Sequence, residues 1–442
     1  MEIAIIFIKS TIIPEKTYMK INIITLGCSK NTVDSEVLAA KWKEKGHEIL
    51  FESTKKSDIV IINTCSFIHD AKEESIEEIF LHIARKQRGE VSKVFVIGCL
   101  AQRYKQELQD MIPEVDGIFT FSELHKLLEE KQFDLLESIN RVLSTPKHYA
   151  YLKISEGCDR ECSFCAIPLI RGKQTSKSVE MLVQEAEMLA QQGVKELLLI
   201  AQDLTYYGID IYQHRTLDKL MRKLAAVKGL EWIRLHYAYP MGFPYEILNV
   251  MNEFSVFCRY LDIPLQHISD TVLRSMKRGS SKQQIYKFLE TIRNTVPEIA
   301  LRTTLISGYP VETRKEHREL VEFVKEMRFE RLGVFAYSPE EGTAAFELGD
   351  PVKMKEKNHR VREIMELQET ISLQHNQEKV GKVMRVLIDR KEDDFYVGRT
   401  EFDSPEVDNL VYVNADKKLN IGEFYPVLIK EADNYDIFAT IF

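Results

Sequence analysis

The N-terminal part of the chain alternates between short apolar runs and polar, helix-like stretches. Three runs rich in β-branched residues, INIITLGC, DIVIINTC and KVFVIGC, are separated by amphipathic segments near 33–45 and 70–88. Short apolar runs that alternate with helices are typical of βαβ units with a buried parallel sheet. Residues 20–140 are therefore predicted to form an α/β domain around a parallel sheet.

A second alternating series begins at Tyr151. Its six strand candidates are YLKIS, KELLLIAQ, WIRLHYA, YLDIPL, ALRTTLIS and RLGVFAYS, and the helices between them include 179–192, 281–295 and 314–327. A long polar amphipathic stretch, 353–379, follows as a closing helix. Six strand–helix units predict a partial (β/α) barrel over 145–380, with its chemistry at the carboxyl ends of the strands.

The two ends of the chain differ from its middle. From Gly381 the sequence changes to short alternating runs broken by Asp, Asn and Gly, which predicts a small all-β barrel over 381–442. At the other end, Met19 directly precedes the first strand. We expect Met19 to be the native start, residues 1–19 to be an N-terminal extension, and the extension to contribute no core strand. The predicted fold class is α/β, with three domains.

Composition narrows the class of protein. A chain of 442 residues, of which 44% are hydrophobic, can bury several cores. No run reaches the roughly 18 apolar residues of a membrane span, and the first stretch lacks a basic region and a small-residue cleavage site. We therefore expect a cytoplasmic protein with no membrane partner. Seven cysteines are too few for a disulfide framework at this length, so they indicate metal binding or catalysis.

Three cysteines follow the strand YLKIS in the pattern C-x-x-x-C-x-x-C: Cys158, Cys162 and Cys165. Thiolates on so short a loop can hold three corners of a cubane cluster, whereas structural zinc or a fully protein-held cluster requires a fourth ligand nearby. The remaining iron is then open, as in radical S-adenosylmethionine (SAM) enzymes, where it binds the amino and carboxylate groups of SAM. A zinc knuckle with a remote ligand and an inert loop are the competing interpretations.

Three further cysteines, Cys28, Cys65 and Cys99, each end one of the predicted N-terminal strands. If those strands are parallel, the three thiols emerge at one edge of the sheet, where ligands bind in open α/β folds. A single buried strand cysteine is more often a core residue, but three equivalent positions predict a second metal site. Cys258 has no cysteine at metal-binding spacing and is predicted to be a core residue.

Three segments carry a family resemblance: ITLGCSKNTVDSE, YLKISEGCDRECSFCAIPLIRG and PLQHISDTVLRSMKRG. From residue 20 onward the chain resembles the methylthiotransferase family of radical SAM enzymes, with a C-terminal domain similar to TRAM. Within that family it is most similar to the ribosomal-protein aspartate methylthiotransferases (RimO type). The transfer-RNA branch is expected to read nearer to GCQMN at residues 27–31. One departure is Val311, which occupies the second glycine of the family's G-x-P-G-E-T turn and would be strained if that position needs a positive φ.

The resemblance implies a transferase with two 4Fe–4S clusters that uses SAM twice, once for methylation and once to generate a radical. Its implied substrate is the β-carbon of an aspartate in small-subunit ribosomal protein S12, and a flavodoxin or ferredoxin is the expected reductant. The same chemistry on a transfer-RNA adenosine is the nearest alternative. A non-catalytic iron–sulfur scaffold is an alternative from a different class.

Other polar positions are candidates for contacts with SAM. Gln202 and Asp203 follow the second barrel strand, Arg302 lies in the fifth, and Phe164 directly precedes the last cysteine of its motif. An arginine could bind the SAM carboxylate with two hydrogen bonds, or it could form a structural ion pair. The sequence does not decide between packing and function for His267, Tyr206 and Tyr207, and it identifies no general acid or base.

The net charge of the chain and of its C-terminal domain distinguishes a nucleic-acid partner from a basic protein partner. The net charge of the chain is −8, and residues 381–442 hold eight Lys and Arg against thirteen Asp and Glu. A domain that binds a phosphate backbone needs several Lys or Arg contacts, so nucleic acid is not expected as a direct substrate. We expect an acidic surface that suits a basic ribosomal protein, formed by the run Glu392, Asp393 and Asp394 and by Glu401, Asp403, Glu406 and Asp408. A solvated acidic face without a partner is the alternative.

Overall fold

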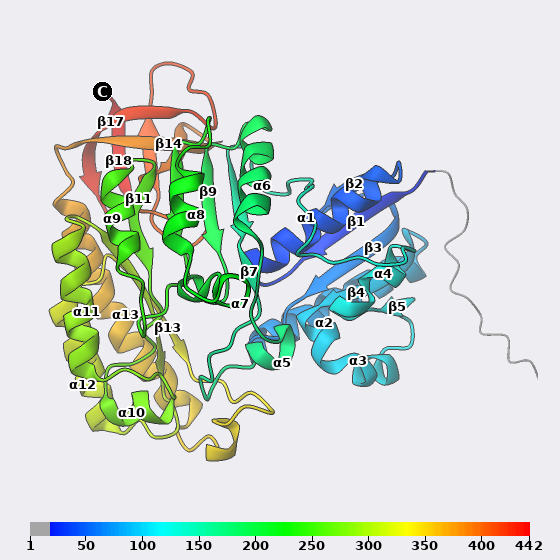
Figure 1. Cartoon of the computed structure of the whole chain (residues 1–442), viewed down its shortest axis with the longest axis horizontal. Helices are drawn as coiled ribbons and strands as arrows, with labels where there is room; N and C mark the ends of the chain where they lie inside the picture. The colour runs from blue at the N-terminus through cyan, green and yellow to red at the C-terminus, as the bar shows by residue number, and fades with distance from the viewer. Residues whose placement is uncertain (1–17) are drawn as a thin grey trace, which may run out of the picture.

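The computed structural model describes residues 18–442 (Figure 1). Its N-terminal domain is a five-stranded sheet in the order β2-β1-β3-β4-β5, with every neighbouring pair parallel. The predicted N-terminal extension falls mostly on residues 1–17, which lie outside the described residues. The strands are β1 (Lys20–Thr25), β2 (Glu48–Phe51), β3 (Ser57–Thr64), β4 (Val91–Gly98) and β5 (Gly117–Ile118), and the helices are α1 (Ser29–Glu44), α2 (His69–Gln87), α3 (Cys99–Met111), α4 (Leu124–Leu127) and the 3-10 turn η1 (Phe121–Glu123).

Both faces of this sheet are covered. Ile21, Ile23 and Ile61 point to the face that packs on α1, whereas Val60 and Ile62 point to the face that packs on α2 and α3. Successive strand residues point to opposite faces, so burial of both faces requires nearly continuous apolar runs. This requirement explains the uninterrupted runs in the sequence and confirms the predicted parallel sheet.

The central domain is an open barrel of six parallel strands in the order β13-β12-β11-β10-β9-β6, as predicted. These are β6 (Tyr149–Lys153), β9 (Glu196–Ile200), β10 (Trp232–Leu235), β11 (Phe257–Asp262), β12 (Ala300–Ser307) and β13 (Arg331–Ala336). The remaining elements are α5 (Ile167–Arg171), α6 (Val179–Gln191), α7 (Ile209–Tyr212), α8 (Leu217–Leu224), α9 (Glu246–Glu253), α10 (Asp270–Ser275), α11 (Lys282–Thr295), α12 (Arg314–Met327), α13 (Met354–Gln377), the 3-10 turns η2 (Leu204–Tyr206) and η3 (Phe346–Leu348), and the hairpin β7 (Ser155–Glu156) with β8 (Thr175–Ser176).

The two faces of the central sheet have different chemistry. Leu197 and Leu199 of β9 join the large apolar core beneath the surrounding helices. Their neighbour Glu196 points the other way, into the concave inner face, where Arg234 and Tyr260 also lie because they alternate with core residues of their own strands. The inner face of the barrel is therefore rich in buried charges.

The C-terminal domain is a closed five-stranded barrel in the order β14-β15-β16-β18-β17. Its interior is aliphatic, with Val386, Ile388, Val413 and Ile429 fully buried. This arrangement confirms the predicted all-β barrel. The strands are β14 (Val383–Glu392), β15 (Phe395–Arg399), β16 (Val411–Asn414), β17 (Phe424–Ala432) and β18 (Ile437–Ile441).

A loop of the C-terminal domain, residues 399–408, fills part of the concave face of the central barrel. Asp403 binds Arg331 at 2.9 Å, and Arg399 forms an ion pair with Glu196 at 2.8 Å. Beside these charges an apolar cluster joins the two domains, and Cys258 is buried in it as a core residue, as predicted. We call these contacts between residues 381–442 and the central sheet the C-terminal junction.

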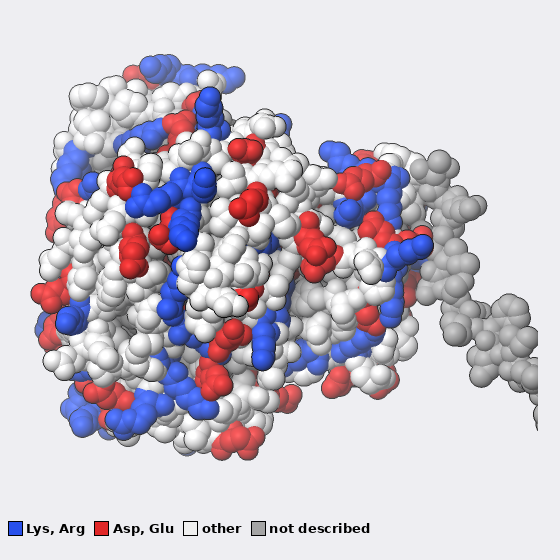
Figure 2. Space-filling view, in the orientation of Figure 1, with Lys and Arg blue, Asp and Glu red and all other residues white. Residues whose placement is uncertain are grey.

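The predicted acidic surface on the C-terminal domain is wrong for Glu401, Asp403, Glu406 and Asp408, because their carboxylates bind groups within the chain, whereas Glu392, Asp393 and Asp394 are exposed. Asp403 and the side chain of Asp408 are almost fully buried, and Glu406 accepts hydrogen bonds from the hydroxyls of Tyr149 and Tyr151. The backbone amide of Arg259 donates to Glu401 at 3.2 Å. On the face drawn in Figure 2, side chains of both signs are interspersed, including over the C-terminal barrel at the top. Two of these carboxylates, Asp403 and Asp408, neutralise Arg331 and Arg302 of the central barrel.

Candidate active site

The motif cysteines Cys158, Cys162 and Cys165 lie in the loop that follows β6 and β7, at the carboxyl end of the sheet. The loop is closed by backbone hydrogen bonds from Cys158 N to Gly172 O and from Cys165 N to Cys162 O, both 3.1 Å. Gly157 has φ +75°, and a Cβ there would lie 2.1 Å from the carbonyl oxygen of Lys173. Only glycine fits this close approach, so the first turn of the loop depends on it.

Two side chains from other elements approach this cysteine loop. Arg278 donates to Cys162 Sγ at 3.2 Å, and the hydroxyl of Tyr239 lies 3.8 Å from the same sulfur. The Arg278 guanidinium also lies over the Tyr239 ring, 4.2 Å from its centroid. Arg278 belongs to the segment PLQHISDTVLRSMKRG, but the sequence did not identify it as a site residue. A cation at the sulfur stabilises the thiolate, the form that binds iron.

The second cysteine group lies at the carboxyl edge of the N-terminal sheet, as the strand pattern predicts. Cys28 precedes α1, Cys65 follows β3, and Cys99 begins α3. A Cβ on Gly27, the residue before Cys28, would lie 2.8 Å from Cys65 Sγ, so these two segments nearly touch. Gly27 has φ +93°, a conformation that favours glycine. The parallel sheet thus brings three cysteines from distant positions together.

The thiols of each group are close enough to affect one another's ionisation. Burial, with smaller contributions from the nearby Cys99 and Cys28, raises the pKa of Cys65 to about 12. Burial likewise raises the pKa of Cys165 to about 12, with further contributions from Cys162 and Cys158. Without a cation these thiols stay protonated, so the charge of bound iron would have to displace their protons.

The donor set fits a cluster better than a single ion. Within residues 18–442, no group of three or more His, Cys, Asp or Glu side chains has the spacing to hold one metal ion. A four-iron cluster spreads its thiolate ligands over separate corners, and soft thiolates are its usual ligands. Each group offers three cysteines and would leave one iron free. The ligand assignment remains a prediction from these contacts.

The four predicted SAM contacts have different environments. Gln202 donates to Glu156 at 2.5 Å, and its own carbonyl oxygen is buried without a partner. Asp203 has both oxygens engaged, one by Arg160 at 2.9 Å and the other by Thr205. Gln202 therefore keeps an acceptor for a ligand, whereas Asp203 caps η2 and positions Arg160.

The other two predicted SAM contacts are engaged within the protein. Arg302 forms ion pairs with Asp262 at 3.2 Å and Asp408 at 3.3 Å, so the structure favours the alternative of a structural ion pair. Phe164 packs in an apolar cluster that includes Tyr309 and Tyr337. Its role at the cofactor stays a prediction.

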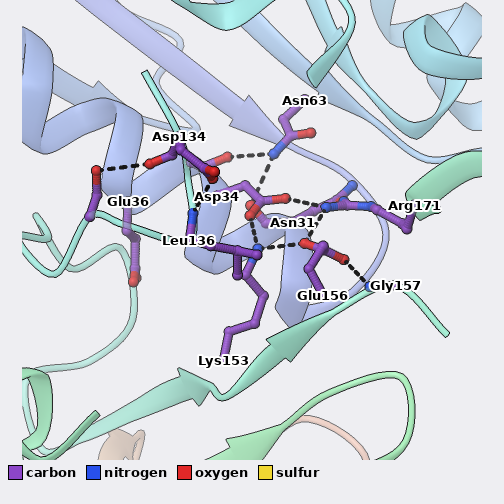
Figure 3. Close-up of polar contacts among 12 residues, drawn as sticks. Asn31, Asp34, Glu36, Asn63, Asp134, Leu136, Lys153, Glu156, Gly157 and Arg171 are labelled. Carbon is purple, nitrogen blue, oxygen red and sulfur yellow. Dashed lines mark hydrogen bonds and ion pairs between the residues drawn. The ribbon is translucent and has the colours of Figure 1, made fainter. Parts of the chain in front are cut away.

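A network of charged side chains joins α1 of the N-terminal domain to the segments on either side of the cysteine loop (Figure 3). Arg171, in α5 just after the cysteine motif, donates to Asp34 at 2.7 Å and to Glu156 at 2.9 Å. Another of its nitrogens lies 3.5 Å from Cys99 Sγ. Lys153 donates to the same two carboxylates. We call Asp34, Lys153, Glu156 and Arg171 the bridging network.

In the bridging network, opposite charges lower the pKa of Glu156 and raise the pKa of Lys153 and of Arg171. Burial alone would raise the pKa of the Glu156 carboxyl, but the neighbouring charges of Arg171 and Lys153 outweigh this effect and hold the pKa well below its usual range. Two cations and two carboxylates balance one another in a buried position. All four residues lie in the segments that carry the family resemblance, which was the available signal for them.

The three residues whose role the sequence did not decide, His267, Tyr206 and Tyr207, contact other groups of the protein. His267 is fully buried and accepts a hydrogen bond from Ser269 N, and the hydroxyl of the buried Tyr207 donates to Lys177 O. The ring of Tyr206 lies beside the guanidinium groups of Arg160 and Arg215. These contacts explain the three residues by packing.

The turn containing Val311 does not require a left-handed conformation at that residue. Among the described residues, positive φ angles occur at Gly308 but not at Val311. A Cβ on Gly308 would lie 2.4 Å from Lys357 Cγ, so the first glycine of the turn is the restricted one. Val311 instead packs against the apolar cluster around Tyr309. The predicted strain at Val311 is absent.

Three family models match different parts of the chain. The model described as "Uncharacterized protein family UPF0004" matches residues 20–120, that of the "Radical SAM superfamily" matches 152–324, and that of the "TRAM domain" matches 380–442. A radical SAM barrel with a second cysteine group in front and a TRAM barrel behind defines a radical SAM enzyme of the methylthiotransferase class. This class uses SAM and two 4Fe–4S clusters.

Relatives identify the branch. The chain is 53% identical to "Ribosomal protein uS12 methylthiotransferase RimO" from Christiangramia forsetii, over 95% of this chain and 94% of the relative. A protein of the same name from Flavobacterium psychrophilum is 53% identical, with 95% and 97% covered. The chain belongs to the RimO family of ribosomal protein uS12 methylthiotransferases.

Solved structures support the fold alone. A radical S-adenosylmethionine methyltransferase from Kitasatospora setae, TsrM, matches with a TM-score of 0.53 at 14% identity, covering 74% of this chain and 77% of that one. The cobalamin-dependent radical enzyme OxsB matches with a TM-score of 0.51, covering 80% and 58%. Within residues 18–442, no helix is long and apolar enough to cross a membrane.

Proposed function

We propose that this protein adds a methylthio group to the β-carbon of an aspartate in ribosomal protein uS12. The observation that carries the proposal is the pair of three-cysteine groups joined by the bridging network, in a chain 53% identical to named uS12 methylthiotransferases. The C–H bond of that carbon is unactivated, so acid–base chemistry cannot break it readily at neutral pH. When bound, two 4Fe–4S clusters and SAM supply the radical and the methylthio group.

The chain's own residues would bind the cofactors and orient the reacting groups. Cys158, Cys162 and Cys165 would hold one cluster, with Arg278 stabilising the thiolate of Cys162. Gln202 offers its unpaired carbonyl oxygen at the carboxyl end of β9, where an ammonium or hydroxyl group of SAM could donate to it.

The second cluster would be held by Cys28, Cys65 and Cys99. Arg171 would keep it at a fixed distance from the first, because its ion pairs tie α5 to the N-terminal domain. Fixed separation matters, since a carbon radical must meet its sulfur donor in the correct geometry.

Iron content tests the two-cluster assignment. Anaerobically reconstituted protein should bind about eight irons, the number in two cubane clusters. Replacing Cys158, Cys162 and Cys165 with Ala should leave about half of this iron and abolish release of 5′-deoxyadenosine from SAM. Replacing Cys28, Cys65 and Cys99 should preserve SAM cleavage and stop sulfur transfer. Saturation of the unsubstituted protein at one cluster would contradict the assignment.

A side-by-side assay tests the substrate. Purified uS12 and transfer RNA are offered to the reconstituted enzyme with SAM and a reductant, and the products are analysed by mass spectrometry. We expect methylthiolation of uS12 and none of transfer RNA. Modification of transfer RNA alone would overturn the substrate assignment and leave the radical chemistry intact. A non-catalytic iron–sulfur scaffold would modify neither acceptor and would cleave no SAM.

The proposal includes the setting of the reaction. A ribosomal protein is made in the cytoplasm, so we place the enzyme there. A small, low-potential electron carrier such as a flavodoxin or ferredoxin would supply electrons to the SAM-binding cluster. Reduction of the reconstituted protein by either carrier, followed by absorbance, tests this part.

A further inference from the structure

A buried lysine lies between the two cysteine groups. Lys30 is in the first turn of α1, two residues after Cys28, and its side chain points away from the helix towards the central barrel. Its Nζ lies 3.1 Å from the centroid of the Tyr237 ring. Lys30 is only 8% exposed. The ammonium group therefore lies at the boundary of the N-terminal and central domains, close to the candidate ligand Cys28.

The ammonium of Lys30 lacks a counter-ion within the protein. In the part of the chain that the structure describes, no carboxylate forms an ion pair with Nζ and no oxygen accepts a hydrogen bond from it. The aromatic face of Tyr237 attracts the charge but accepts no conventional hydrogen bond, whereas an ammonium has three N–H donors. Most of the Lys30 side chain is buried, but Nζ is not among the fully buried polar atoms that lack a partner, so an external anion can reach it.

Neighbouring cations do not share this property. Lys153 and Arg171 are both neutralised by Asp34 and Glu156 in the bridging network. Those two carboxylates are already occupied. Lys30 is thus a cation kept available for an external anion.

The ring beneath Lys30 is held at the carboxyl end of the barrel. Tyr237 follows β10 and has φ +64°, a conformation that is uncommon for a bulky residue. Its carbonyl accepts from Leu204 N at 3.1 Å, and its amide lies 3.4 Å from Asp262 Oδ2. Such a conformation persists only where the surroundings fix it, and it is typical of functional sites. The strained Tyr237 presents its ring to the ammonium on the side where SAM enters the barrel.

We propose that Lys30 binds the side-chain carboxylate of the substrate aspartate and determines the preference for that residue. This inference rests on the proposed function. The β-carbon to be modified is bonded directly to the carboxylate carbon, so an ion pair at the carboxylate also fixes the position of the C–H bond. Lys30 lies beside the sulfur-donating cysteine group and faces the radical-generating side, so one contact orients the carbon between them. Lys30 is a specificity-determining residue, and Tyr237 positions it.

The test compares two acceptors with two enzymes. Purified uS12 and a uS12 variant with the target Asp replaced by Asn are offered to the unsubstituted enzyme and to Lys30→Met, which keeps the side chain's length and removes its charge. Binding to the reconstituted enzyme is measured by fluorescence anisotropy, and methylthiolation by mass spectrometry. Lys43→Met, an exposed change on the same helix, is the matched control.

We expect the unsubstituted and Lys43→Met enzymes to prefer the Asp acceptor over the Asn acceptor by about 100-fold in kcat/KM. Lys30→Met should lose this preference, because removal of one partner of a buried charge pair has effects of this size. Binding of the Asp acceptor should weaken about 10-fold in Lys30→Met, and binding of the Asn acceptor should stay unchanged. Iron content and 5′-deoxyadenosine release should match the unsubstituted enzyme.

Retention of the Asp preference by Lys30→Met would overturn the inference. If Lys30→Met loses iron, Lys30→Arg replaces that variant in the comparison. Because arginine keeps the positive charge, Lys30→Arg should keep the preference for the Asp acceptor, at reduced turnover. Loss of this preference with normal binding of the Asp acceptor would again overturn the role of Lys30. Failure of the unsubstituted enzyme to modify uS12 would instead contradict the proposed function, so the two failures are distinguishable.

Discussion

The central barrel contacts the N-terminal domain and the C-terminal domain through two junctions. Both junctions are built from buried ion pairs, but they differ in function. At the N-terminal junction, where residues 18–140 contact the central sheet, Lys153 and Arg171 bind Asp34 and Glu156 beside both cysteine groups. At the C-terminal junction, Arg399 binds Glu196 inside the barrel, far along the strands from the cysteine loop. The charges look alike in the sequence.

The difference lies in what remains unpaired. The C-terminal junction satisfies its main charges internally, as in the pairs Arg331–Asp403 and Arg399–Asp389. The N-terminal junction leaves the Lys30 ammonium and the Gln202 oxygen without partners. At the C-terminal junction, Nη2 of Arg234 is also buried without a hydrogen-bond partner, but Arg234 forms an ion pair with Glu196 through Nε. Within the described residues, the two junctions therefore differ in that Lys30 is a whole cation without a carboxylate partner.

The largest expected effect on stability belongs to the C-terminal junction. Arg399→Met leaves Glu196 and Asp389 buried without this arginine, so the free energy of unfolding should fall by about 3–5 kcal/mol. SAM cleavage per folded molecule should stay unchanged. The measurement is a denaturant titration with a 5′-deoxyadenosine assay. Arg222→Gln, which removes an exposed ion pair with Glu253, is the control and should cost under about 1 kcal/mol. A similar, small cost for both variants would contradict the distinction.

Arg171→Met should do less to stability and more to turnover. Lys153 still forms an ion pair with both Asp34 and Glu156, so neither carboxylate loses its last cationic partner and the loss of unfolding free energy should be about 2 kcal/mol. Methylthiolation of uS12 should fall about 100-fold relative to 5′-deoxyadenosine release, because small displacements of reacting groups are costly. Loss of the N–H donor at Cys99 should also shift the potential of the second cluster, measured by redox titration with electron paramagnetic resonance. An unchanged ratio of the two products would argue against a positioning role.

The C-terminal junction should also respond to acid. Burial tends to raise the pKa of the Asp389 carboxyl, but the nearby Arg399 and His148 charges lower it to about 2. A depressed folded-state pKa contributes stability that is present above the ordinary value of 3.8 and is lost as the pH falls through about 2. The contribution is about 2 kcal/mol. Asp389→Asn should therefore be less stable than the unsubstituted protein at pH 5 and close to it at pH 2. An equal gap at both pH values would refute this assignment.

The smallest effect concerns Arg302, the predicted SAM contact that lies in the C-terminal junction. Its partners keep other donors, since Asp262 faces Tyr237 N and Asp408 accepts from Ser404 N. Arg302→Gln should therefore cost only about 1 kcal/mol of unfolding free energy. The affinity for SAM, measured by equilibrium dialysis, should change by less than about twofold. A tenfold weaker affinity would restore the prediction of a SAM-binding arginine.

Periodicity predicted the elements that are long and strongly patterned. All six barrel strands and the helix α13 are where the sequence pattern placed them, because burial on one or both faces fixes the spacing of apolar residues. The short strands β2 and β5 were missed. β2 is only partly buried and β5 spans two residues, so neither has enough positions to show a period.

The positions of the two cysteine groups were predictable because strand ends share one edge of a parallel sheet. The ion-pair partners of charged residues were not predictable, because pairing depends on segments far apart in the sequence. A count of acidic residues predicted an exposed surface, yet Asp403 is buried against Arg331. A usable sign was present in the barrel strands: Arg234 interrupts an apolar run and Arg331 begins a strand, and a buried arginine in a strand needs a carboxylate from elsewhere.

The loop 399–408 has a consequence for how the chain is made. Arg331 begins β13, and its partner Asp403 follows 72 residues later (403 − 331). At about 5–20 residues per second, a ribosome needs roughly 4–14 s to extend the chain between these two points. During that interval Arg331 has been synthesised without its carboxylate. The inner face of the barrel is therefore completed only when the C-terminal domain follows.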